Sequence, residues 1–336
     1  MRILRYIGRR FLFIGPQLFG IILVSFLLVK LIPGDPAVMM LGPFATEQQI
    51  AMLNAEMGLE GTIIDQFWIY LQNLVQGDLG TSWQTTKPVF DDLAIRFPAT
   101  LELVTLSLLL ALLIGIPLGV AAAYFKRSIV KKFSDYYGLL AGSLPDFWLG
   151  LILIYLFYTI MQVAPAPLGR IDFAVLPPAP VTNFLIIDSL IAGNWQALWS
   201  TLGHLVLPVV TLAVINAGPI LKMTQATMER MLESDLIRYA EMCGLPKSVV
   251  IRKAFRNSLP SVVTIVSVLY GFLIGGAVLV EIVFSWGGAG QYAVQGVLNA
   301  DINPVLGFVL FSAILSLIIY LLVDLIYFAI DPRIRG

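Results

Sequence analysis

Long apolar stretches without charge limit this chain more than any other feature. A helix needs about 20 mostly apolar residues to cross a lipid bilayer. Six stretches of about that length or longer are free of charge apart from one aspartate, Asp146: 11–29, 103–125, 136–160, 189–221, 257–280 and 302–323. In the fourth stretch, the part from about Thr201 onward is expected to span. The sequence therefore predicts an all-α membrane protein with six transmembrane helices.

The composition excludes several other classes of protein. Of the 336 residues, 58% are hydrophobic and 12% are charged, whereas soluble globular domains carry about 25% charged residues. A soluble enzyme, a disordered chain, a coiled coil and a nucleic-acid-binding domain are therefore excluded, and no nucleic acid is expected as a partner. The single cysteine, Cys243, cannot form an internal disulfide, and the single histidine, His204, rules out a multi-histidine metal centre. No metal site is expected.

The basic residues gather on one side of the predicted spans. Of the 21 lysines and arginines, 17 fall in four segments: 1–10, 126–135, 222–258 and 331–336. Cytoplasmic loops of membrane proteins carry an excess of these residues. Both termini are therefore expected to be cytoplasmic. The opposite side holds only four basic residues, which are Lys30, Lys87, Arg96 and Arg170.

The segment after the first predicted span has signs of short helices. Thr46 and Gln49 have the spacing of a capping box, which predicts a helix to about Met57. Residues 64–75 are amphipathic and rich in aromatic side chains, but they are too short to span. Such a segment is typical of a helix that lies in the membrane interface.

These assignments divide the chain into three parts. Residues 1–32 are predicted to hold the N-terminal tail and the first transmembrane helix, and residues 33–100 an extracytoplasmic segment with short helices. Residues 101–336 are predicted to form a core of five transmembrane helices. The longest cytoplasmic loop of that core is 222–258.

This loop has the sequence of two short helices joined by a turn. Ser234 and Asp235 can cap a helix that runs to Cys243. Gly244 stands where a helix end favours the left-handed conformation, and Pro246 follows it. A second, basic helix is expected over 248–258, before a Leu-Pro pair leads into the fifth span. The pattern alone fits either a solvated connector or a helix that docks in a partner's groove. It does not fit a DNA-reading motif, because a loop of this length between two spans cannot enclose its own core.

Nine short strings of residues, in one order along nearly the whole chain, carry a resemblance to a known family. They are 32–36, 57–59 with 77–82, 98–103, 115–120, 144–148, 204–208, 234–246, 281–290 and 331–334. Together they resemble the integral-membrane permeases of bacterial ABC importers for dipeptides, oligopeptides, nickel and glutathione, and the peptide branch is the most similar. The resemblance implies the type I ABC importer permease fold in the bacterial cytoplasmic (inner) membrane.

In that family the cytoplasmic loop is the EAA loop, whose helix docks on the ATPase subunit. Ala240 and Gly244 keep the last alanine and the glycine of the general pattern. Arg238 and Tyr239 replace its glutamate and first alanine, so an acidic contact is not carried over, whereas the docking role is. The resemblance assigns this ATPase-coupling role to Ser234, Asp235, Leu236, Ile237, Arg238, Tyr239, Ala240, Glu241, Met242, Cys243, Gly244, Leu245 and Pro246.

Two further groups are candidates for the pathway or its outer gate. The first is Asp146, Phe147 and Trp148 and the second is Glu281, Phe284 and Trp286. An acid inside a membrane is costly and often functional. Each group also fits a plainer role, as an acid and aromatic residues anchored at the membrane interface.

The sequence does not indicate an enzyme. A phosphate-binding loop requires a Gly-Lys pair, and no lysine follows a glycine here. No catalytic residue and no cofactor of the chain itself are therefore expected. The resemblance implies that separate subunits use ATP and Mg. It also implies four kinds of contact: a second homologous permease, two ATP-binding subunits, an extracytoplasmic solute-binding protein and membrane lipid.

The transported substrate stays open. Short peptides are favoured by the overall resemblance, and nickel, glutathione, opines and oligosaccharides are alternatives on the same architecture. An ATP-independent secondary transporter is a less favoured hypothesis, because it needs a buried ion-coupling group for which only Asp146 and Asp324 are candidates. An intramembrane enzyme would need a nucleophile–base pair, and none is recognisable.

Overall fold

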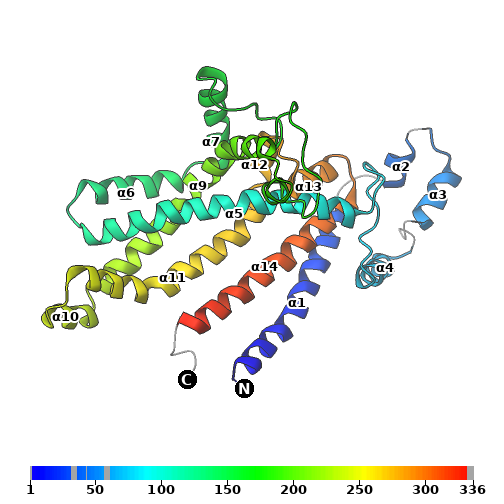
Figure 1. Ribbon diagram of the computed structural model, residues 1–336. Helices are drawn as coiled ribbons and strands as arrows, with labels where there is room; N and C mark the ends of the chain where they lie inside the picture. The colour runs from blue at the N-terminus through cyan, green and yellow to red at the C-terminus, as the bar shows by residue number, and fades with distance from the viewer. Residues whose placement is uncertain (1, 32–35, 43, 57–60, 331–336) are drawn as a thin grey trace. The chain divides into compact units, whose positions relative to one another are not determined.

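A computed structural model of the chain describes residues 2–31, 36–42, 44–56 and 61–330 (Figure 1). The strings at 32–35, 57–59 and 331–334 lie outside the described residues. Within the described residues, the chain consists of helices, loops and one isolated bridge between Thr81 and Pro88. The prediction of an all-α protein is confirmed.

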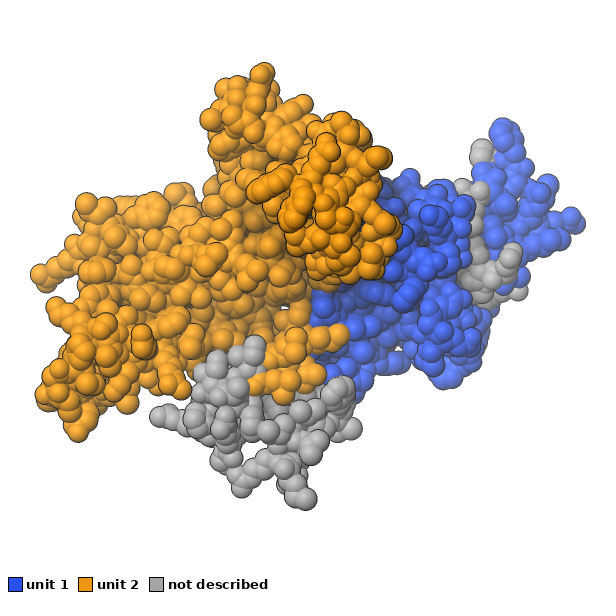
Figure 2. All heavy atoms as spheres, viewed as in Figure 1, with its two compact units in different colours: residues 1–99, 287–317 blue, residues 100–286, 318–336 orange. Residues whose placement is uncertain are grey.

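Two compact units make up the chain (Figure 2). Unit 1 comprises residues 1–99 and 287–317, and unit 2 comprises residues 100–286 and 318–336. Two long helices, α5 (Val89–Tyr124) and α14 (Ile302–Ile330), contribute residues to both units. The remaining helices of unit 1 are α1 (Arg2–Lys30), α2 (Pro36–Leu41), α3 (Glu47–Glu56), α4 (Ile63–Val75) and α13 (Ala289–Leu298).

Unit 2 contains the other helices. They are α6 (Ile129–Ala141), α7 (Asp146–Leu153), the π-helical η1 (Ile154–Ile160), α8 (Leu185–Ile191), α9 (Trp195–Leu232), α10 (Asp235–Met242), α11 (Lys247–Gly276) and α12 (Val278–Val283). Helix α9 is central to this unit, because α6, α7, α8 and α11 all pack against it.

Four described helices are long and apolar enough to cross a membrane. They are α5, α9, α11 and the part of α14 from Ile302 to Val323. The pair α6 and α7–η1 passes the same test jointly, with a bend of 105° between its halves, and α1 contributes a shorter apolar stretch, Ile14–Leu28. The count of six spans and the side on which the termini lie stay predictions.

The stretch expected to form the third span, 136–160, is two helices rather than one. Helix α6 ends at Ala141 and α7 begins at Asp146 after Pro145. A proline disfavours helical geometry in the residue before it and lacks the N–H that a continuous helix would use. The break therefore follows from Pro145, and it leaves Asp146 in the first turn of α7.

The predicted division of the cytoplasmic loop is wrong at its second helix. The expected helix over 248–258 and most of the expected fifth span, 257–280, form one continuous helix, α11, with Pro260 inside it, and the last residues of that span belong to α12. Buried residues recur every four positions across the proline, at Val250, Ala254, Ser258 and Val262. This continuous packing against the rest of unit 2 outweighs the single hydrogen bond that a proline removes. Helix α9 also runs on to Leu232, so most of the predicted loop is helical.

Small residues let α5 approach α9 closely. A Cβ added to Gly115 would lie 2.9 Å from the carbonyl oxygen of Ala217, and one added to Gly119 would lie 2.7 Å from Cβ of Thr224. Close backbone approach of this kind is typical of helix pairs in membranes. It fixes α5 beside the segment of α9 that leads to α10.

Candidate functional site

The residues expected to couple to a partner form a short exposed helix, which we call the α10 turn (residues 234–246). Ser234 has the extended conformation of a residue before a helix, but its hydroxyl donates to the carbonyl oxygen of Met231 at 2.6 Å. The prediction that the Ser234 side chain caps α10 is therefore wrong, because this hydroxyl bonds back to α9 instead. Asp235 begins α10, and its carboxylate lies 3.9 Å from the Arg238 guanidinium.

The end of α10 follows the prediction. Gly244 has a φ of +74°, and its N–H donates to the Glu241 carbonyl at 2.9 Å. The Leu245 N–H donates to the Ala240 carbonyl at 3.2 Å. These two bonds satisfy carbonyls that a helix end leaves free, in the pattern that requires a left-handed residue. Pro246 then directly precedes α11.

One side of α10 is anchored in an apolar cluster. Ile237 is fully buried and packs with Ala123 of α5, Met228 of α9, and Val250 and Ala254 of α11. Three long helices thus meet at one isoleucine. A movement of α10 would therefore displace side chains that pack on α5, α9 and α11.

The other side of α10 is exposed and largely apolar. Leu236, Tyr239 and Met242 have exposed fractions of 56%, 70% and 79%, and Cys243 is exposed beside them. A pocket of about 330 Å³ lies between α10 and α11, lined by Leu236, Tyr239, Ala240, Cys243, Leu245, Lys253 and Asn257. Exposed apolar side chains gathered in one patch are common on surfaces that bind other proteins.

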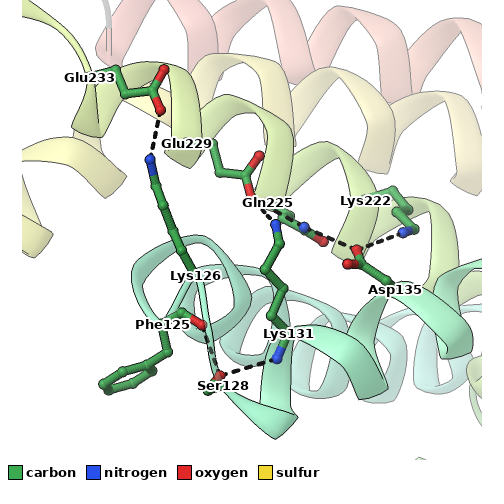
Figure 3. Close-up of polar contacts among 9 residues, drawn as sticks. All are labelled: Phe125, Lys126, Ser128, Lys131, Asp135, Lys222, Gln225, Glu229 and Glu233. Atoms are coloured by element: carbon green, nitrogen blue, oxygen red, sulfur yellow. Dashed lines mark hydrogen bonds and ion pairs between the residues drawn. The ribbon is translucent and has the colours of Figure 1, made fainter.

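A ladder of polar contacts joins α6 and the residue Lys126 to the end of α9, the segment that leads to α10 (Figure 3). Lys131 Nζ lies 2.6 Å from Glu229 Oε1, and Lys222 Nζ lies 3.1 Å from Asp135 Oδ1. Lys126 Nζ, just after α5, lies 2.6 Å from Glu233 Oε1. Gln225 Nε2 also donates to Asp135 at 3.2 Å.

We call these seven residues the α6–α9 ladder. The three- to four-residue spacing of the polar residues on α9 was a signal in the sequence, although their partners were not.

The first pathway group lies at the start of α7. The side chains of Phe147 and Trp148 are 38% and 46% exposed. Among the described residues, Oδ1 of Asp146 is buried and has no hydrogen-bond partner. One turn further along α7, Gly150 packs against Phe284: an added Cβ would lie 3.2 Å from Phe284 Cε2. Helix α7, which carries the first group, therefore contacts Phe284 of the second group at Gly150.

The second pathway group is buried inside unit 2. Glu281, Phe284 and Trp286 have exposed fractions of 0%, 3% and 1%. The Thr100 hydroxyl donates to Glu281 Oε1 at 2.5 Å. The backbone N–H of Trp286 donates to the backbone carbonyl of Glu281 at 2.8 Å. In this conformation these three side chains are therefore buried in the interior of unit 2 and do not line an accessible surface.

Sequence reasoning missed a buried ion pair beside this group. Arg170 Nη2 lies 2.6 Å from Glu102 Oε2, and the two side chains are 17% and 4% exposed. Glu102 Oε1 also accepts the Ile186 N–H at 2.9 Å, and the Arg170 guanidinium lies 5.8 Å from the centre of the Trp286 ring. We call Thr100, Glu102, Arg170, Glu281 and Trp286 the Glu102 cluster. Its signal in the sequence was Arg170, one of few basic residues on its side.

The loop that carries Arg170 is held by a second buried carboxylate. Asp188 accepts the backbone N–H groups of Val181, Thr182 and Asn183 at 2.8–3.2 Å, and the Thr182 hydroxyl at 2.7 Å. Burial acts to raise the pKa of Asp188, but these hydrogen bonds outweigh it, so the pKa lies below its ordinary value of 3.8. The loop is thus fastened to α8 at neutral pH.

The α10 turn and the Glu102 cluster lie at opposite ends of α5. Twenty-one residues separate Glu102 from Ala123, which is about 32 Å at the rise of an α-helix. The hydrocarbon core of a bilayer is about 30 Å thick. The distance between the two sites along α5 is therefore comparable to the thickness of that core. Within the described residues no three histidine, cysteine or acidic side chains are grouped so as to hold a metal ion.

The chain is similar to membrane components of known transport systems. Residues 115–336 match the family described as "Binding-protein-dependent transport system inner membrane component", and residues 3–104 match its N-terminal counterpart. The chain is 39% identical to a probable D,D-dipeptide transport system permease protein, DdpB, of Escherichia coli K12, over 94% of each chain. It is 36% identical to the dipeptide transport system permease protein DppB of Alkalihalophilus pseudofirmus, over 99% of each. It is 33% identical to the glutathione transport system permease protein GsiC of Escherichia coli O6:H1, over 99% of each.

Proposed function

This chain belongs to the family of inner membrane components of binding-protein-dependent transport systems, and we propose that it is the permease subunit of an ATP-driven importer of short peptides. Its role is transport rather than catalysis. The apolar helices α5, α9, α11 and α14 suit a multi-pass protein of the inner membrane. The peptide assignment is supported by the dipeptide permeases among its relatives.

The observation that carries the mechanism is the exposed α10 turn. Its anchor residue, Ile237, packs on three long helices, whereas Tyr239 and Met242 face outward. We propose that residues 234–246 dock on an ATP-binding subunit. When ATP closes the two ATP-binding subunits, α10 moves with its partner, and the shared cluster passes the movement to α5, α9 and α11.

We propose the predicted orientation and assembly on this basis. The α10 turn and both termini face the cytoplasm, and the Glu102 cluster faces the outside. The complex holds a second homologous permease, two ATP-binding subunits that use ATP and Mg, and a solute-binding protein that delivers peptide. Residues 1–32 form the tail and first span, 33–100 the extracytoplasmic segment, and 101–336 the transport core.

We propose that the outer end of the pathway lies where α7 meets α12. Phe147 and Trp148 are exposed there beside the partly buried Asp146, and Glu281, Phe284 and Trp286 are buried in or just after α12. We expect substitution of Asp146 to have the largest effect on transport in this group, because one of its carboxylate oxygens is buried without a hydrogen-bond partner among the described residues.

A second candidate substrate is glutathione, itself a short peptide. The glutathione permease of Escherichia coli O6:H1 is 33% identical over nearly the whole chain, which is lower than the identity to the dipeptide permeases. The same architecture serves both substrates, so the substrate that stimulates the complex decides between them.

Purification of the whole transporter tests the coupling role. The chain is expressed with its partner subunits, and ATP hydrolysis is measured with and without a peptide-loaded binding protein. Tyr239→Ala is expected to reduce retention of the ATP-binding subunits about tenfold, as loss of roughly 1.4 kcal/mol of binding would. The matched control is Tyr136→Ala, since Tyr136 on α6 is 69% exposed and Tyr239 is 70% exposed.

Two results would overturn the proposal. One is equal retention of the ATP-binding subunits by both variants and by Tyr239→Ala/Met242→Ala. The other is peptide transport by the chain alone without ATP, which would favour a secondary transporter.

A further inference from the structure

Helix α4 has a wider apolar surface than its neighbours cover. Thr62 and Asp65 form a capping box at its start. At 3.6 residues per turn, eight of its nine apolar and aromatic side chains, all but Ile69, occupy an arc of about 160°. They are Ile63, Ile64, Phe67, Trp68, Tyr70, Leu71, Leu74 and Val75. No residue of α4 is buried, so a large part of this arc has no cover within the described chain.

Part of the arc rests on α1 through aromatic contacts. The Phe67 ring lies 6.0 Å from Phe19 and 5.2 Å from Phe26. Tyr70 stacks on Phe26 at 5.7 Å. On the adjoining part of the arc, Ile64, Trp68 and Val75 are 78%, 59% and 83% exposed.

These contacts fix the depth of α4. Phe19 and Phe26 lie within Ile14–Leu28, the apolar stretch of α1. At about 1.5 Å per residue they lie about 16 Å and 6 Å from Lys30, the end of α1. Phe67 sits against both, so α4 lies beside apolar α1 and not in the water beyond it. For comparison, the apolar face of an in-plane helix lies about 5–10 Å into the boundary of headgroups and acyl chains.

The polar side of α4 agrees with this placement. Asp65, Gln72 and Asn73 are exposed on the face opposite the apolar arc, which also holds one apolar residue, Ile69. Hydrogen bonds from Thr62 hold the pKa of Asp65 below its usual range, so this face carries a charge at neutral pH and needs water. Helix α1 also has exposed apolar side chains, at Val24, Leu27 and Leu28.

We propose that α4 is an in-plane membrane anchor that inserts Ile64, Trp68 and Val75 into lipid at the outer surface of the bilayer. The assignment of the outer surface rests on the proposed orientation, whereas the insertion rests on the contacts with α1. The occupant is phospholipid, because the arc has no basic residue for an anionic protein partner and holds a tryptophan, which favours the membrane interface.

Spin labels on single cysteines test the anchor in the assembled transporter. Cys243, the only cysteine, is replaced by serine, and the complex is reconstituted in phosphatidylethanolamine–phosphatidylglycerol vesicles. Ile64→Cys, Trp68→Cys and Val75→Cys probe the apolar arc, and Gln72→Cys and Asn73→Cys are the matched controls on the polar face. Relaxation by oxygen and by a water-soluble nickel chelate is measured at each site.

The apolar sites are expected to show a ratio of oxygen to nickel relaxation several-fold above the controls. Equal, high nickel access at all five sites would place α4 in water and overturn the proposal. Low access to both reagents at the apolar sites would mean that protein covers them, which also overturns it. Peptide-stimulated ATP hydrolysis is measured on the unmodified transporter, because Cys243 lies in the α10 turn, and it reports on the proposed function separately from the labels.

Discussion

The α10 turn and the Glu102 cluster stand at the two ends of α5 and use their side chains in opposite ways. At the α10 turn one buried residue, Ile237, holds the helix, and Tyr239 and Met242 remain exposed. At the Glu102 cluster the charged and aromatic groups bond to one another inside unit 2. The α10 turn therefore has free surface for a partner, whereas the Glu102 cluster stabilises the fold in this conformation.

Two ion pairs make this difference measurable. Arg170–Glu102 and Lys126–Glu233 have the same nitrogen–oxygen distance, 2.6 Å. The side chains of the first pair are 17% and 4% exposed, and those of the second are 51% and 65% exposed. Distance alone does not separate them, so we expect burial to be the main source of the difference in their effects.

The largest expected effect is that of Arg170→Ala. This change leaves the Glu102 carboxylate buried without its cation, which typically costs about 3–5 kcal/mol of the free energy of unfolding. Chemical unfolding of the purified transporter in detergent measures the loss. The loop around Arg170 should also become open to proteolysis, because its contact with Trp286 is lost at the same time.

A double variant is the control for that effect. Glu102→Gln/Arg170→Met removes both charges and keeps an acceptor for the Ile186 N–H. It should recover most of the stability that Arg170→Ala loses, because no charge is left buried alone. If the single variant were as stable as the unmodified protein, the Glu102 cluster would not be a closed structural unit.

An intermediate effect is expected from Gly244→Ala. Gly244 has a φ of +74° and no atom within 4 Å of an added Cβ, so the cost is the left-handed backbone itself, about 1–2 kcal/mol. Hydrogen exchange at the Gly244 and Leu245 amides should rise, since the end of α10 opens. Retention of the ATP-binding subunits should fall as well.

Gly203→Ala is the matched control for that prediction. Gly203 lies inside α9 and also has no atom within 4 Å of an added Cβ, but its backbone is helical. Alanine in a helix interior is favoured over glycine by roughly 0.5–1 kcal/mol. Opposite signs for the two variants would show that φ, and not space, makes Gly244 necessary.

The sequence was informative where local chemistry decides the structure. Gly244 and Pro246 predicted the end of α10, Thr46 and Gln49 predicted the start of α3 through hydrogen bonds that the structure contains, and the apolar stretches predicted the helices. The break between α6 and α7 also has a local cause, Pro145, although residues 136–160 were predicted as one span.

Tertiary contacts decided the rest. Pro260 suggested a helix boundary, but buried residues on both sides of it keep α11 continuous. Glu102 and Arg170 are separated by 68 positions, and no periodicity in a single sequence pairs residues so far apart. The same holds for the α6–α9 ladder, whose members come from α9 and from the end of α5 through α6.

The smallest effect is expected from Lys126→Ala, and it is the sharpest test of the comparison. Its hydrogen bond and charge hold the pKa of Glu233 below its ordinary value of 4.5. Because the pKa of Glu233 is lower in the folded state than in the unfolded state, the pair stabilises the folded protein above the unfolded-state pKa. This contribution is lost as the pH falls through the folded-state pKa of Glu233. At pH 7 Lys126→Ala should therefore lower stability slightly.

High salt should remove that difference, because the screening length falls to about 3 Å at 1 M and both partners are exposed. The loss in Arg170→Ala should persist under the same salt, since the Glu102 side chain is 4% exposed. A salt-resistant effect of Lys126→Ala would mean that the α6–α9 ladder is as closed as the Glu102 cluster. Coupling at α10 would then depend on a rigid α6–α9 unit and not on the apolar anchor at Ile237 alone.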